Sequence, residues 1–175
     1  MKKQDIVQLL ETKHDALYTF LDQQSPEKWE QGPQDKWTTG QHVLHLIQSA
    51  KYLNKALGYP KFLLRYKFGK SNRVPREYEA IIKRYNERLE GVQGITFGPS
   101  RNMRVPQLNE KTTLINDLKR QENLLKKRTQ KWKDTHLDNL LLPHPLMGRM
   151  PVREIIMWSA YHVEHHAKTL ENQYN

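Results

Sequence analysis

Two histidines near the carboxyl end of the chain, His162 and His166, are the residues best suited to chemistry. Residues four apart on an α-helix share one face, with Cβ atoms about 6 Å apart, so two imidazoles there can bind one metal ion. A catalytic site normally needs a third protein ligand, and His45 is the candidate. Three neutral imidazoles would leave a divalent ion its full charge and an open position. Such an ion could activate water, or a substrate thiol or carbonyl.

The other five histidines have weaker support as ligands. His42 and His165 each lie about 60° around their helix from a proposed ligand, so outer or surface positions are expected for them. His14, His136 and His144 have no supporting spacing. Because a pair four apart also arises by chance in a chain with eight histidines, an ordinary core or surface position remains the alternative for the pair. No carboxylate stands at helical spacing from the ligands, so the catalytic base is unknown.

Length and composition predict one cytoplasmic domain. A chain of 175 residues fits a single domain with a sizeable core. It has no cysteine, which excludes disulfides and thiolate metal sites and leaves histidine and carboxylate as strong metal ligands. The first residues lead into an amphipathic pattern without an apolar signal region, and no stretch has the ~20 apolar residues of a membrane span. Export and membrane insertion are therefore not expected.

A basic stretch suggests a second kind of partner. The formal net charge is +10, and residues 60–104 hold eleven Lys and Arg against four Glu. Several aromatic residues lie in the same stretch, so it could stack bases over phosphate contacts and bind nucleic acid. A solvated insertion explains the same composition, and nucleic-acid binding is the less favoured interpretation.

Four segments have apolar residues at helical spacing, and they predict an all-α four-helix bundle. The second segment begins with a capping box, in which Thr38 and Gln41 satisfy each other's backbone N–H groups. Between the second and third segments, residues 59–108 are rich in glycine and proline, which predicts an irregular insertion with at most a short helix at 76–89. No segment alternates strongly enough to require a sheet. The predicted helices are residues 3–23, 38–57, 109–133 and 151–171.

The long second connection predicts the order of the helices. Antiparallel neighbours need only about 2–8 connecting residues, whereas this link has roughly fifty and can cross the bundle. If the second and third helices run parallel, the second runs antiparallel to the fourth, and His45 meets the level of His162 and His166. The metal hypothesis therefore predicts an up-down-down-up bundle.

Trp37 stands directly before the capping box and has two possible roles. It could be a platform for substrate. The favoured interpretation is a hydrophobic staple, in which the residue before the cap packs against the first turns of the helix.

Two motifs resemble the DinB/YfiT-like metalloenzyme superfamily. Residues 37–46 are similar to the family's Trp-Ser/Thr-x-x-Glu/Gln-x-x-x-His-Leu entry to the second helix. Residues 148–154, followed by His162, His165 and His166, look like the family's last helix. Two departures are Gln41, where Glu is commoner, and Met150-Pro151 in place of a polar cap.

The resemblance implies a bundle with parallel second and third helices and a three-histidine site for zinc or nickel. Carried over by position, the ligands would be His45, His162 and His166. It also implies a thiol-dependent transferase using a low-molecular-weight thiol, or a metal-dependent hydrolase, acting on a small molecule, and a homodimer. The alternatives are the nucleic-acid or anion-binding module described above and a non-catalytic metal-binding bundle.

Overall fold

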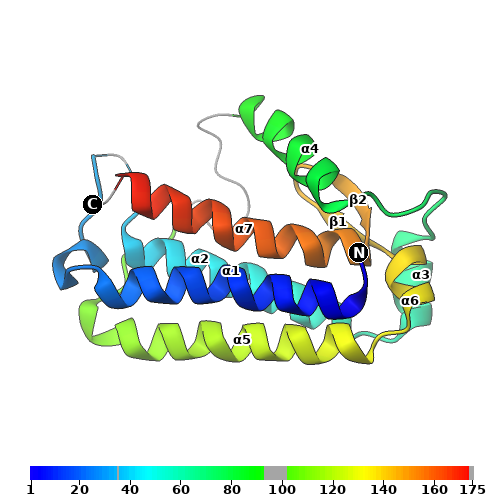
Figure 1. Cartoon of the computed structure of the whole chain (residues 1–175), viewed down its shortest axis with the longest axis horizontal. Coiled ribbons are helices and arrows are strands. Elements are labelled where there is room, and N and C mark those ends of the chain that lie inside the picture. Colours follow the sequence, from blue (N-terminus) through cyan, green and yellow to red (C-terminus); the bar gives the residue numbers. More distant parts are fainter. Residues whose placement is uncertain (35, 93–101, 174–175) are drawn as a thin grey trace.

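Four long helices build the molecule, as the apolar spacing predicted. A computed structural model describes residues 1–34, 36–92 and 102–173. The long helices are α1 (Lys3–Gln23), α2 (Thr39–Gly58), α5 (Lys111–Lys131) and α7 (Val152–Gln173). They lie side by side as a bundle (Figure 1), which confirms the all-α four-helix prediction.

The order of the helices is up-down-down-up. Figure 1 shows α1 and α7 running in one direction and α2 and α5 in the other. The α2 helix packs mainly against α5, and α1 packs mainly against α7. The parallel pair of α2 and α5 is joined by the long insertion, which crosses the bundle. The predicted topology is therefore confirmed.

The capping box fixes where α2 begins. Gln41 donates its backbone N–H to Oγ1 of Thr38 at 3.2 Å, and the backbone N–H of Thr38 donates to Oε1 of Gln41 at 2.9 Å. Between them Gly40 lies against the buried Trp29, and a Cβ at this position would come within 3.0 Å of the indole. A larger residue here would force Trp29 to shift by a few tenths of an ångström, so glycine suits this close approach of the first turn of α2 to the preceding segment.

The insertion contains more regular structure than its composition predicted. It holds α3 (Lys61–Phe68) and α4 (Tyr78–Glu90), and a short 3₁₀ turn (Leu108–Glu110) leads into α5. The α4 helix corresponds to the short helix predicted at 76–89, whereas α3 was not predicted. Its eight residues give too few turns for a helical period to be recognised. The part of the insertion at 93–101 lies outside the described residues.

A small hairpin precedes the last helix and was also not predicted. After α6 (Asp134–Asn139), β1 (Leu141–His144) pairs antiparallel with β2 (Gly148–Pro151). Each strand has four residues and contains a proline, so neither shows a clear alternation. Gly148, the first residue of β2 after the three-residue loop, has φ of 72°, a left-handed conformation that glycine adopts without strain. Pro151 ends β2, and α7 begins one residue later than expected.

The buried side chains form two apolar clusters. One lies under the hairpin and α4, and the other lies between α1, α2, α5 and the second half of α7. Among the described residues, none of the helices combines the length and the hydropathy that crossing a membrane requires.

Candidate metal centre

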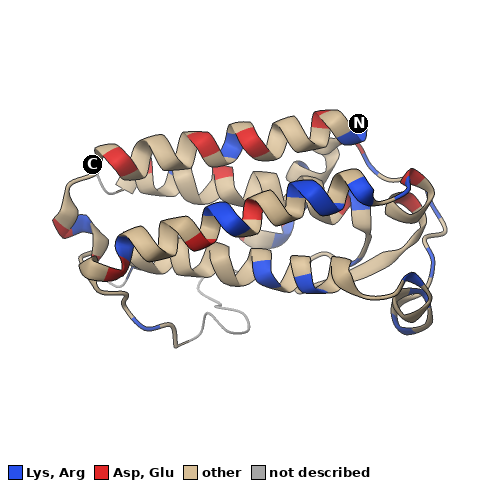
Figure 2. Cartoon of the chain, turned by 90° about the horizontal axis from the view of Figure 1, so that it is seen from below, with Lys and Arg blue, Asp and Glu red and all other residues tan. Residues whose placement is uncertain are grey.

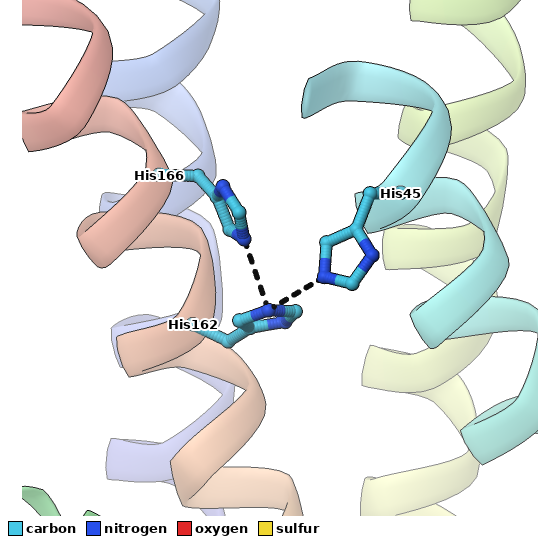
Figure 3. A group of neighbouring side chains, drawn as sticks. All are labelled: His45, His162 and His166. Carbon is cyan, nitrogen blue, oxygen red and sulfur yellow. Dashed lines mark hydrogen bonds between the residues drawn. The ribbon is translucent and has the colours of Figure 1, made fainter. Parts of the chain in front are cut away.

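Three histidine side chains from two helices meet inside the bundle. His45 comes from α2, while His162 and His166 lie one turn apart on α7 (Figure 3). Nε2 of His162 lies 3.0 Å from Nε2 of His45 and 3.1 Å from Nε2 of His166. One nitrogen from each ring lies within 4.8 Å of the others, close enough to bind a single ion. The structure therefore brings together the three predicted ligands.

The three rings are held in the neutral form that binds metal. His162 and His166 are buried, and His45 is half-buried. Burial lowers the pKa of His45 to about 4 and the pKa values of His162 and His166 well below the usual histidine value. At neutral pH each ring keeps a nitrogen lone pair, which coordination requires. The residues therefore fit a divalent ion with an open position.

His42 contacts the site from outside the set of three. Its Nδ1 lies 2.8 Å from Nδ1 of His166, and the side chain is buried. If Nε2 of His166 bound an ion, the proton of that ring would be on Nδ1 and would be donated to Nδ1 of His42. Such a contact fixes the tautomer and orientation of a metal-binding histidine. His42 thus occupies the outer position that was one of its two predicted roles.

Trp37 packs directly on the histidines. It contacts His42 with ring centroids 5.5 Å apart, which is the pairing of a staple, because His42 is the fourth helical residue. Its indole also stacks on His166, with centroids 6.3 Å apart and an interplanar angle of 8°, and lies 5.1 Å from the His45 ring. The residue before the cap therefore holds the start of α2 and covers the candidate metal centre.

A cavity of about 580 Å³ opens beside the three histidines. Its walls are mainly apolar and come from α2, the hairpin, α4 and α7, with Leu53, Leu142, Ile155 and Tyr85 among them. No Lys, Arg, Asp or Glu is found among the described residues that line it. The volume suits a small molecule with an apolar body.

A sequence comparison agrees with this geometry. The model of the DinB superfamily matches residues 9–170, nearly the whole chain. The chain belongs to the DinB superfamily. No curated protein matches it. For this DinB protein, the family match and the three converging histidines together support a site that can hold a metal ion.

The departure at Gln41 has a structural reason in this DinB protein. The Gln41 side chain caps α2 through its oxygen and donates its Nε2–H to the backbone carbonyl of Met103 at 2.8 Å. A glutamate could make the cap, but its ionised carboxylate has no proton to donate to the Met103 carbonyl at neutral pH. Glutamine therefore connects the start of α2 to the end of the insertion.

Two residues of the cavity wall were not predicted, His144 and Trp158. His144 ends β1, and its ring lies perpendicular to Trp158 with centroids 4.2 Å apart. Trp158 stacks on His162 with centroids 4.6 Å apart. His165 also lines the cavity, whereas His14 is buried on α1 and His136 lies on α6. The His-Pro-Leu-Met-Gly turn at 144–148 was the available signal for a hairpin, but it does not indicate contact with α7.

Proposed function

We propose that this DinB superfamily protein is a metal-dependent enzyme that acts on a small molecule in the cavity, preferentially as a thiol-dependent transferase. The main support for this proposal is that the Nε2 atoms of His45, His162 and His166 converge at the cavity wall. A bound zinc or nickel ion would act as a Lewis acid and lower the pKa of a thiol or water at its open position.

The cavity favours a thiol over water as the nucleophile. Among the described lining residues there is no carboxylate to accept a proton. A thiol has a pKa of about 8.5, whereas water has a pKa of about 15.7, so a thiol needs far less help to ionise. The apolar walls would exclude bulk water from the reacting groups and orient the apolar body of the second substrate. Hydrolysis is the alternative reaction at the same site.

Metal analysis tests the site. Protein purified without a histidine tag is expected to contain about one equivalent of a divalent ion, and His45→Ala, His162→Ala and His166→Ala should each lose most of it. His136→Ala is the matched control, because His136 lies on α6 away from the cavity, and it should keep the ion. Equal metal content in all variants would contradict the proposed ligand set.

Activity measurements separate the reactions. Transfer of a low-molecular-weight thiol to small electrophiles should depend on the bound ion and be lost in His162→Ala. Ester hydrolysis without any thiol would favour the hydrolase instead. Full metal occupancy with no turnover in either assay would favour a non-catalytic metal-binding bundle.

The nucleic-acid alternative has less support from the charge distribution. Several cations of the basic stretch have partners within the chain: Arg73 and Arg76 pair with Glu154, Arg104 pairs with Glu110, and Lys61 lies over the ring of Trp132. Figure 2 shows Lys and Arg interspersed with Asp and Glu on the face that it draws. This alternative would be supported if the protein bound duplex DNA and if that binding weakened steeply as the salt concentration rose.

A further inference from the structure

Three hydrogen-bonding side-chain atoms of cavity-wall residues have no partner among the described residues. They are Oε1 of Gln48, which can only accept, and two ring nitrogens, Nε2 of His144 and Nε1 of Trp158. His144 and Trp158 both line the cavity and are only 7% and 9% exposed, and the two nitrogen atoms themselves have almost no exposed surface, so a ligand oxygen reaches them only after a small movement of the two rings. The free-energy cost of a buried donor without an acceptor is about 1–3 kcal/mol. Two such atoms on adjacent rings therefore require an explanation, and the three metal-site histidines do not supply one.

The hairpin fixes His144 as a donor. Its Nδ1 accepts the backbone N–H groups of Leu146 and Met147, each at 3.1 Å. The ring proton must then be on Nε2, at the edge of the ring away from the turn. Burial also lowers the pKa of His144 to about 4, so the ring is neutral at pH 7. His144 therefore presents one neutral N–H group whose direction is set by the hairpin.

Trp158 differs from two other buried tryptophans of the chain. Trp29 donates its indole N–H to the carbonyl of Gln107 at 3.0 Å, and Trp132 donates to the carbonyl of Leu57 at 3.2 Å. An indole N–H can only donate, so the Trp158 group cannot be satisfied by changing its role. The perpendicular packing of His144 on Trp158 offers at most a weak N–H contact to a ring face. An unused donor thus remains in the wall.

We propose that His144 and Trp158 form a substrate-recognition subsite, which binds a carbonyl or carboxylate oxygen of a molecule with an apolar body. This inference rests on the proposed function, because it names the substrate class of the same cavity. Both groups are neutral donors, and such donors suit an oxygen acceptor. The surrounding walls are apolar and suit a hydrocarbon or aromatic body.

The position of the subsite relates it to the reaction. Trp158 stacks on His162, so an oxygen bound at the indole N–H would lie beside the three histidines. The rest of the molecule would extend along the cavity toward α2 and α4. His144 and Trp158 would then determine which substrates bind and how they are oriented.

Paired ligands and paired variants test the subsite. Acetophenone carries a carbonyl on an aromatic body, and ethylbenzene has nearly the same shape without an acceptor. Wild-type protein should bind acetophenone more tightly, and the indole N–H resonance of Trp158 should move downfield on binding. Trp158→Phe keeps the stacked ring and removes the donor. His144→Asn keeps an oxygen that can accept the turn N–H groups, as in an Asx turn, and removes Nε2.

Each variant should weaken acetophenone binding by about 3- to 10-fold, the usual worth of one hydrogen bond, and leave ethylbenzene binding unchanged. If a variant weakens the binding of acetophenone and of ethylbenzene equally, the residue contributes only to the shape of the cavity, and the proposal would be overturned. No preference for acetophenone in the wild type, or no shift of the Trp158 resonance, would also overturn it.

Removing the metal separates this inference from the proposed function. The preference for acetophenone should persist in wild-type protein treated with a chelator, because the donors belong to the protein. A preference that disappears with the ion but survives in both variants would show that the ion binds the carbonyl. That result would overturn the subsite and leave the metal-dependent function standing. If the wild-type protein binds no metal in any preparation but still prefers acetophenone, the subsite would stand and the metal-dependent function would be contradicted.

Discussion

The contact between His42 and His166 should control how tightly an ion is held. His42→Leu removes the Nδ1 acceptor that orients the His166 ring. Loss of such a partner typically weakens metal affinity about 10- to 100-fold, so we expect that loss here. Competition with a chromogenic chelator measures it.

A second substitution at the same position separates orientation from packing. His42→Asn places an amide oxygen close to where Nδ1 stood, so it can still accept the His166 proton. We expect its metal affinity to lie much nearer to that of the wild type. If Leu and Asn weaken binding equally, His42 acts through packing with Trp37 and not through the hydrogen bond.

Between elements, buried Glu154 connects the first turn of α7 to the insertion. Its carboxylate is fully buried and accepts hydrogen bonds from the side chains of Arg73 and Arg76 and from the backbone N–H of Arg76. Although burial opposes ionisation, these bonds lower the pKa of Glu154. The Glu154 carboxylate therefore holds the segment before α4, which contains Arg73 and Arg76, against the first turn of α7.

Glu154→Gln should lower the free energy of unfolding by about 2 kcal/mol, below the usual cost of breaking a buried ion pair, because both arginines are partly exposed and can regain water. Urea denaturation measures this loss, and hydrogen exchange should rise at residues 71–77. Glu87→Gln is the matched control, since Glu87 is exposed on α4, and its effect should stay within about 0.5 kcal/mol. Similar losses in both variants would contradict a special role for Glu154.

Local patterns could predict the long helices and the grouping of three histidines. The capping box sets where α2 begins, and the spacing of His162 and His166 places them on one face of α7. The single further assumption that the second and third helices run parallel then places His45 at the level of that pair. The hairpin could not be predicted in this way, because Pro143 and Pro151 interrupt two very short strands. His144 and Trp158 meet only because that hairpin folds back onto α7, and no local spacing encodes such a contact.

For the molecule as a whole, buried neutral histidines make folding dependent on pH. Burial lowers the pKa of His42 to about 3 and those of His45 and His144 to about 4, whereas a histidine in an unfolded chain has a pKa of about 6.5. Between pH 4 and 6.5 the unfolded chain therefore binds more protons than the folded protein. Their contribution to stability is present above about pH 6.5 and is lost as the pH falls toward 4.

The contribution of a single histidine can be measured from the change in the free energy of unfolding with pH. Each buried neutral histidine should lower the free energy of unfolding by up to about 1.4 kcal/mol for each pH unit below 6.5. His144→Asn keeps an acceptor for the hairpin turn and removes one titrating ring, so its slope between pH 6 and 5 should be shallower by about that amount. Urea denaturation at both pH values, with a chelator present in every sample to remove the effect of metal binding, measures the slope. An unchanged slope would mean that the folded His144 ring gains its proton over the same pH range as in the unfolded chain, so that below about pH 6 its Nδ1 could not accept the two N–H groups of the turn.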